Sequence, residues 1–284
     1  MSDLHIPNGA AASTLIRVDT HAHVFHPDLP MVAERRYTPS YTASIDDYLG
    51  HLDQHQLSHG ILVQPSFLGT DNHYLLAALA SAGPRLHGIA VIDVDTPWAD
   101  LAAMAQVGVV GIRFNLVGTH LPDLNAPAWQ ALLPHLASLG WQVQLHGNVA
   151  QLLAMLPPLL DQGLNVVIDH FGRPQYVDAL VQDHAYHQLL DQAAEARTVW
   201  FKLSGLYRIS TDPAEQFTFT STAIPLLLRR LGPERLLWGS DWPHTQHETL
   251  VNYAATVAQL SDWLPDEGLR QTVLGASAQA LFRL

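Results

Sequence analysis

Two histidines separated by one residue, His21 and His23, end the apolar run Leu15-Ile16-Arg17-Val18 and the short polar segment after it. Strand residues alternate faces with a period of two, so both imidazoles would lie on one side of a strand end. Such a pair can ligate a metal ion. The spacing alone is weak, because 17 histidines in 284 residues give roughly one such pair by chance.

Four more residues of chemical interest lie at or near the ends of later apolar runs: Arg113, His146, His170 and Asp241. Histidine and carboxylate groups gathered in one place are the usual means of general acid–base catalysis and of metal binding. Whether these residues meet in space depends on the elements that carry them.

The chain contains eight apolar runs of strand length, and segments with helical spacing lie between them. The runs span residues 15–24, 60–64, 87–93, 109–114, 142–146, 165–170, 199–203 and 235–241. Nearly continuous apolar strands are typical of a parallel sheet buried on both faces. Eight β–α units over about 265 residues match an α/β fold of the (β/α)8 TIM-barrel type. A doubly wound open sheet is the alternative, but no Gly-x-Gly-x-x-Gly follows the first run.

Helix-start signals separate several of these runs. Ser44 is followed three residues later by an acid, and Pro97 is expected in the first turn of another helix. No linker, repeat or low-complexity break interrupts the pattern. We therefore expect one barrel domain over residues 1–284, with residues 1–14 forming a flexible or strand-like N-terminal extension.

In such a barrel the carboxyl ends of all strands converge on one rim, where active sites lie. His21, His23, His146, His170 and Asp241 would share that rim. Each alone has an ordinary structural explanation, such as a loop hydrogen bond or an Asx turn. If these five residues occurred by chance, they would be distributed over both ends of the barrel. Their common position at one rim therefore predicts a functional site.

Composition narrows the classes of function. A hydrophobic content of 48% supports a folded core, and the formal charge of −12 argues against nucleic-acid binding. The chain has no cysteine, so any metal would be held by histidine and carboxylate. No uninterrupted apolar stretch of 18 residues or signal-like start is found, which indicates a cytoplasmic protein without membrane contact. The single lysine, Lys202, is expected in a salt bridge rather than as a covalent nucleophile.

Three motifs resemble the amidohydrolase superfamily, and within it the branch of 2-pyrone-4,6-dicarboxylate lactonase and related sugar and muconolactone lactonases. They are the first His-x-His, Val-Ile-Asp-His-Phe-Gly-Arg-Pro at 167–174 and Trp-Gly-Ser-Asp-Trp-Pro-His at 238–244. The likeness also includes residues 36–39, 69–72, 111–115 and 200–202, so it covers nearly the whole chain.

The resemblance implies a hydrolase of aromatic catabolism that opens a small carboxylated lactone. Asp241 would activate water for attack on the ester carbonyl and then protonate the leaving oxygen. His21, His23 and His170 would polarise the carbonyl and position the water, directly or through a metal.

The substrate implied is a small anion, because guanidinium groups bind carboxylates in a bidentate manner. The relevant arginines stand at or just beyond three strand ends. Candidate substrate-binding residues are Arg113, Arg173, Arg208, Tyr37, Ser66, Thr70, Asn72, His146 and His244.

Two departures from the pyrone lactonase stand out. His146 occupies a position that resembles a tyrosine site, and the segment 116–120 lacks a further arginine, so the substrate need not be the same dicarboxylate. With His21, His23 and Asp241, His146 resembles the ligand set of mononuclear members of the superfamily. One divalent ion, zinc or similar, and metal-free catalysis both remain open.

Three other functions are compatible with this fold and these residues. A metal-dependent non-oxidative decarboxylase of an aromatic or unsaturated acid would share the fold and the ligand set. A lactone isomerase is the second alternative, although such isomerases tend to lack the aspartate kept here as Asp241. A barrel that retains these residues without catalysis is the third. A homo-oligomer is left open.

Overall fold

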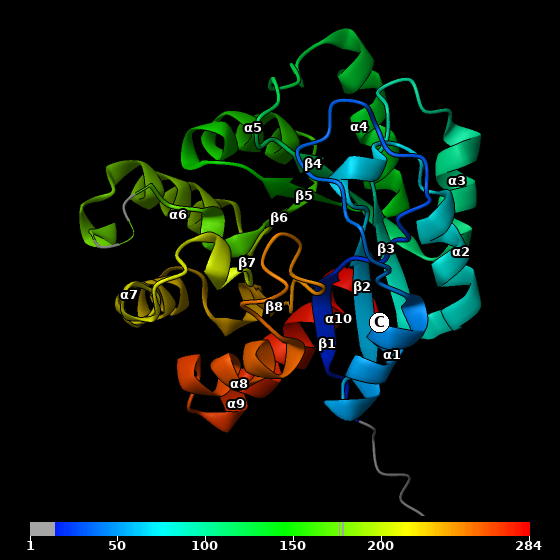
Figure 1. Ribbon diagram of the computed structural model, residues 1–284. Coiled ribbons are helices and arrows are strands. Elements are labelled where there is room, and N and C mark those ends of the chain that lie inside the picture. Colours follow the sequence, from blue (N-terminus) through cyan, green and yellow to red (C-terminus); the bar gives the residue numbers. More distant parts are fainter. Residues whose placement is uncertain (1–14, 176, 178) are drawn as a thin grey trace, which may run out of the picture.

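The computed structural model describes residues 15–175, 177 and 179–284, so the extension expected over residues 1–14 lies outside the described residues. Eight parallel strands follow one another around a single sheet in sequence order (Figure 1). They are β1 (Val18–Ala22), β2 (His59–Val63), β3 (Leu86–Ala90), β4 (Val109–Asn115), β5 (Gln142–His146), β6 (Asn165–Ile168), β7 (Val199–Leu203) and β8 (Leu236–Trp238). The prediction of a TIM-type barrel is confirmed, and each of the eight predicted runs overlaps a strand.

The barrel closes where the chain beyond β8 meets β1. The hydroxyl of Thr20 donates to the carbonyl of Trp238 at 2.8 Å. Beyond β8, the backbone N–H of Asp241 donates to the carbonyl of His21, and that of His23 donates to the carbonyl of Trp242, both at 2.8 Å. This closure brings Asp241 beside the His-x-His pair, although more than 200 residues separate them in the chain.

Helices surround the strands as Figure 1 shows. Their bounds are α1 (Ile45–Gln54), α2 (His73–Ala82), α3 (Trp98–Val107), α4 (Pro127–Leu139), α5 (Val149–Asp161), α6 (His184–Ala196), α7 (Pro213–Leu231), α8 (Tyr253–Trp263), α9 (Glu267–Gln271) and α10 (Ser277–Phe282). Ser44 and Asp47 form the expected capping box of α1, whereas Pro97 is the N-cap of α3 and precedes its first turn. None of the described helices is both long and apolar enough to cross a membrane.

Two apolar clusters hold the fold together. The larger lies between the strands and the surrounding helices. The smaller joins inward-facing strand residues such as Ile61 and Val167 to Leu281 and Phe282 of α10. The segment leading into α10 packs near the start of β1, because a Cβ on Gly275 would meet the carbonyl of Ile16 at 2.3 Å. The amino-terminal end of the barrel is therefore packed with side chains, and the polar residues lie at the other end.

Candidate active site

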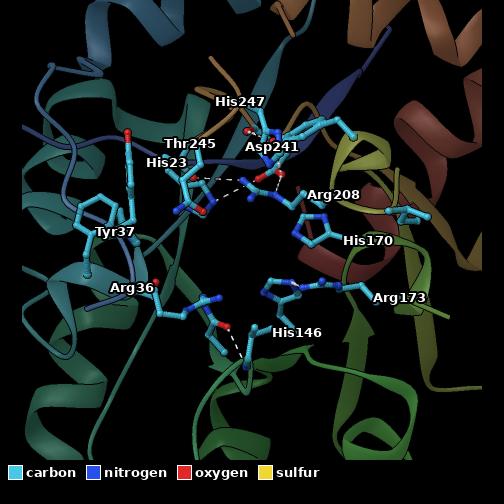
Figure 2. A pocket seen from close by; sticks show the side chains of 18 of the residues that line it. His23, Arg36, Tyr37, His146, His170, Arg173, Arg208, Asp241, Thr245 and His247 are labelled. Carbon is cyan, nitrogen blue, oxygen red and sulfur yellow. Dashed lines mark hydrogen bonds and ion pairs between the residues drawn. The ribbon is translucent and has the colours of Figure 1, made fainter. Parts of the chain in front are cut away.

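A cavity of about 570 Å³ opens at the carboxyl ends of the strands. Figure 2 shows the side chains around it, with His23 and Asp241 on the upper side of the central space and Arg36 and His146 on the lower side. Nine of the predicted catalytic and substrate-binding residues line this cavity. The lining includes His23, Arg36, Tyr37, Ser66, Arg113, Asn115, His146, His170, Arg173, Tyr207, Arg208, Asp241, Thr245 and His247.

Asp241 is buried, and its two carboxylate oxygens have different surroundings. Oδ2 accepts hydrogen bonds from Nε of Arg208 at 2.6 Å and from the hydroxyl of Tyr207 at 2.7 Å. Oδ1 has no hydrogen-bond partner among the described residues. Burial raises the pKa of Asp241, but Arg208 and the nearby imidazoles outweigh it and hold this pKa well below its ordinary value. Asp241 is thus a carboxylate at neutral pH with one oxygen free to accept a proton.

The imidazoles of the His-x-His pair both face that free oxygen. Nε2 of His21 lies 3.6 Å and Nε2 of His23 lies 3.5 Å from Oδ1 of Asp241, and the two nitrogens are 3.3 Å apart. Ligands of a tetrahedral ion with bonds of about 2.0–2.1 Å lie about 3.3–3.4 Å from one another. The spacing of these three atoms therefore suits a small divalent ion.

A second group with metal-ligand spacing shares one member with the first: it consists of His21, Asp169 and His170. His146 belongs to neither group of described residues. Its Nε2 lies 3.4 Å from a guanidinium nitrogen of Arg173, and its ring contacts that of His170 with centroids 4.8 Å apart. His146 thus lines the cavity beside an arginine, apart from the three converging atoms.

The hydrogen bonds of His21 are less suitable for binding a metal ion than the spacing of the three converging atoms is. His21 is fully buried beside Lys202, whose Nζ lies 3.0 Å from its Nδ1. Burial lowers the pKa of Lys202 to about 8, although Asp169 opposes the shift, so the amine carries its full proton set at neutral pH. Burial and then Lys202 lower the pKa of His21 well below its ordinary value. A neutral His21 that accepts at Nδ1 has its proton on Nε2, the atom an ion would need.

Asp169 is a buried carboxylate that was not among the predicted site residues. Its Oδ2 accepts from Nε of Arg113 at 2.9 Å, and its Oδ1 lies 3.2 Å from Nζ of Lys202. Burial raises the pKa of Asp169, but Lys202 and Arg113 outweigh it and lower that pKa well below its ordinary value. Lys202 is therefore in the salt bridge that the sequence predicted.

His170 reaches the cavity from an unusual backbone conformation. His170 has φ 53° and Asp241 has φ 59°, the left-handed region that non-glycine residues seldom adopt and that concentrates at functional sites. Nδ1 of His170 lies 2.9 Å from the hydroxyl of Ser204. Gly205 allows the two side chains to approach, because a Cβ there would lie 2.6 Å from Nδ1 of His170 and 3.2 Å from Oδ2 of Asp241.

Four guanidinium groups surround the cavity, and they differ in their partners. Arg113 pairs with Asp169 and Arg208 pairs with Asp241. Arg36 and Arg173 make no ion pair with a described residue. Partial burial and the neighbouring arginines lower the pKa of Arg36, and partial burial together with Arg208 lowers that of Arg173. Two of the four positive charges are available for an anion.

The remaining predicted residues divide into two sets. Tyr37 and Ser66 line the cavity, and the hydroxyl of Tyr37 donates to Glu248. Thr70, Asn72 and His244 are not among the described residues that line it. The amide of Asn72 instead bonds the backbone of Thr70 and Val91. His244 is buried against the ring of Tyr207.

Several lining residues were not predicted. Arg36 directly precedes Tyr37 in the segment 36–39, which is part of the likeness to the lactonases, so the sequence contained a signal for Arg36. Tyr207 directly precedes Arg208, and Thr245 and His247 follow the motif that ends at residue 244. Nothing in their spacing distinguishes these residues from ordinary loop residues, since they lie in irregular segments rather than at strand ends.

A (β/α)8 barrel with clustered histidine, aspartate and arginine at its carboxyl rim defines the class as a barrel enzyme. Residues 18–284 match the amidohydrolase family profile. The chain belongs to the amidohydrolase family, as its motifs predicted.

The relatives of the chain process lactones. It is 29% identical to the 2-pyrone-4,6-dicarboxylate hydrolase of Comamonas testosteroni over 89% of this chain and 80% of the relative. It is equally identical to the D-galactarolactone isomerase of Agrobacterium fabrum over 94% of this chain and 91% of the relative. The structure of a probable 2-pyrone-4,6-dicarboxylic acid hydrolase from Acinetobacter baumannii with citric acid bound has a TM-score of 0.88 and 37% identity, covering 94% of this chain and 99% of that one.

Proposed function

We propose that this chain is a lactonase that hydrolyses a small lactone bearing at least one carboxylate. The observation that carries the proposal is Oδ1 of Asp241, which accepts no hydrogen bond from a described residue and faces a cavity that also presents Arg36 and Arg173, neither in an ion pair with a described residue. A general base needs an unoccupied lone pair, and an anionic substrate needs a cation that no acidic residue has already neutralised. Relatives that hydrolyse or isomerise lactones support the same substrate class.

In the proposed reaction Asp241 accepts a proton from water as the water oxygen attacks the lactone carbonyl. His23 donates Nδ1–H to the carbonyl of Val63 at 2.7 Å, and this contact orients its ring with Nε2 toward the attacking water. The bond between the acyl carbon and the ring oxygen then breaks, and Asp241 returns the proton to the ring oxygen. The product carries a new hydroxyl group and a new carboxyl group, and the carboxyl group releases the second water proton to solvent as it ionises.

The carbonyl oxygen gains negative charge in this step and requires hydrogen-bond donors. When the hydroxyl of Ser204 donates to Nδ1 of His170, the proton of His170 is on Nε2, toward the cavity. Arg113 adds a fixed positive charge, because Asp169 holds its guanidinium in place. Arg36 and Arg173 bind the substrate carboxylates. None of these steps is assigned to a metal ion.

The proposal is tested by supplying carboxylated lactones, namely 2-pyrone-4,6-dicarboxylate, muconolactones and sugar-acid lactones, and recording acid release. We expect acid release from at least one carboxylated lactone and none from its uncharged methyl ester. Carbon dioxide release from hydroxybenzoic acids is recorded in parallel, because a decarboxylase is the main alternative. Activity on no lactone, with carbon dioxide released from an aromatic acid, would overturn the proposal.

A further inference from the structure

Lys202 lies behind the cavity with no exposed surface, and its ammonium group contacts three polar atoms. Nζ donates to Oε1 of Gln144 at 2.6 Å, lies 3.0 Å from Nδ1 of His21 and lies 3.2 Å from Oδ1 of Asp169. An ammonium group has three N–H donors and no acceptor. Two of these contacts, those with Gln144 and His21, are hydrogen bonds, and the contact with Asp169 is an ion pair.

This contact decides where His21 carries its own proton. A neutral imidazole has one N–H and one bare nitrogen. Because Nδ1 of His21 accepts from Lys202, the proton lies on Nε2. That N–H faces Nε2 of His23 at 3.3 Å and Oδ1 of Asp241 at 3.6 Å.

His23 has the opposite arrangement. Its Nδ1 lies 2.7 Å from the carbonyl of Val63, and a carbonyl can only accept, so Nδ1 carries a proton and, in the neutral form of the ring, Nε2 is bare. Oδ1 of Asp241 is also an acceptor. If His21 had a bare Nε2 as well, three lone pairs would face one another within 3.6 Å. Three converging lone pairs are stable only around a cation.

We propose that Lys202 is a positioning residue that keeps the proton of His21 on Nε2, so that a proton rather than a metal ion joins His21, His23 and Asp241. Binding an ion at Nε2 would move this proton to Nδ1, where it would meet an N–H of Lys202. The inference rests on the proposed function at one point, namely that Asp241, which the Nε2–H of His21 faces, is the general base. The tests of this inference measure the position of a proton and the binding of zinc rather than lactone turnover. Failure of the inference and failure of the proposed function can therefore be distinguished.

The first test needs no substitution. In wild-type protein labelled with nitrogen-15 in histidine, the ring nitrogens of His21 are assigned by the signals missing from His21→Gln. We expect Nδ1 of His21 to resonate as an unprotonated nitrogen and Nε2 as a protonated one, with the reverse for His23. A protonated Nδ1 on His21 would overturn the proposal, and this outcome does not depend on the folding of any Lys202 variant.

The second test removes the lysine. In Lys202→Met, Nδ1 of His21 can donate to Oδ1 of Asp169, which lies 3.5 Å away, and Nε2 becomes a third ligand atom. Carboxylate–histidine contacts of this kind support bound zinc, and altering such supporting contacts changes metal affinity about 10- to 100-fold. We expect Lys202→Met to bind zinc at least about tenfold more tightly than wild type, measured by competition with a chelating dye.

The matched control is Gln144→Met, which removes another partner of Lys202 and leaves its contact with His21. We expect this variant to bind zinc as wild type does. Equal zinc affinity in wild type and a folded Lys202→Met would contradict the proposal. The same gain in both variants would also contradict it, since a loosened pocket rather than the His21 proton would then be the cause.

Discussion

Nε of Arg208 donates to Oδ2 of Asp241 at 2.6 Å, and this contact divides the carboxylate into a held oxygen and a free one. The held oxygen also accepts from Tyr207, so the orientation of the carboxylate is fixed. The free oxygen faces the histidines and the cavity. The predictions below follow from this division and from the groups around it.

Replacing Asp241 by Asn removes the proton acceptor while keeping the shape of the side chain. We expect kcat on the best lactone of the panel to fall by about 10²- to 10⁴-fold, the range that general acid–base groups contribute. Initial rates measure the loss, and near-ultraviolet circular dichroism shows whether the fold is kept. A loss of less than about tenfold would remove Asp241 from the role of base.

The low pKa of Asp241 depends on Arg208, which opposes the effect of burial. The base must be ionised, so activity is lost as the pH falls through this pKa. Arg208→Gln removes the largest of the effects that oppose burial, and we expect the acid limb of kcat/KM to move to higher pH by at least about one unit. The comparison uses the position of the limb, because its height also reflects substrate binding. Coincident limbs in the two proteins would refute the dependence.

Arg36 and Arg173 are expected to bind the substrate carboxylates. Arg36→Gln and Arg173→Gln should each raise KM for a carboxylated lactone by about 10-fold or more, the value of one charge-assisted contact. Arg35→Gln is the matched control, since Arg35 is exposed and bonds Thr38 and the carbonyl of Val32. If the Arg35 variant raises KM equally, the effect is general surface charge rather than binding in the cavity.

A methyl group at Gly205 should disturb the catalytic residues directly. Its Cβ would lie 2.6 Å from Nδ1 of His170, so we expect Gly205→Ala to lower kcat by at least about 100-fold. Gly163→Ala is the control, because Gly163 has a similar positive φ and no atom within 4 Å of the added Cβ. Both variants should lose about 1 kcal/mol of unfolding free energy through backbone strain. Only Gly205→Ala should lose activity.

The buried histidines should make the fold sensitive to acid. Burial lowers the pKa of His170 and of His244 to about 4, against about 6.5 in an unfolded chain. Below pH 6.5 the unfolded state therefore binds more protons, and stability is lost as the pH falls toward 4. Each group should cost about 2 kcal/mol between pH 7 and pH 5. Urea unfolding at the two pH values measures this, and an unfolding free energy that is equal or higher at pH 5 would contradict it.

The fold could be predicted from the sequence because buried parallel strands leave an unmistakable pattern. Most residues of the strands are buried, so all eight strands appeared as largely apolar runs with helical segments between them. The residues at the rim could be predicted from the same pattern, because the pattern shows where each strand ends. His23, His146, His170, Asp241 and Arg113 were placed at the cavity in this way.

Contacts that depend on loop paths were harder to predict. Asp169 lies in the motif at 167–174, but its ion pairs are formed with Lys202 and Arg113, which come from two other strands. Arg36 reaches the cavity from a long irregular segment after β1. Asn72 ties two backbone segments together instead of lining the cavity, because its position relative to the barrel axis is set by a turn that no periodicity marks.

The central claim is that water adds to a lactone. The most direct test is turnover of the best panel substrate in oxygen-18-labelled water, followed by mass spectrometry of the product. We expect one labelled oxygen in the new carboxylate of a ring-opened product and no loss of carbon dioxide. An unlabelled product with the mass of the substrate would identify an isomerase, and a product that has lost carbon dioxide would identify a decarboxylase; either result would contradict the proposed lactonase.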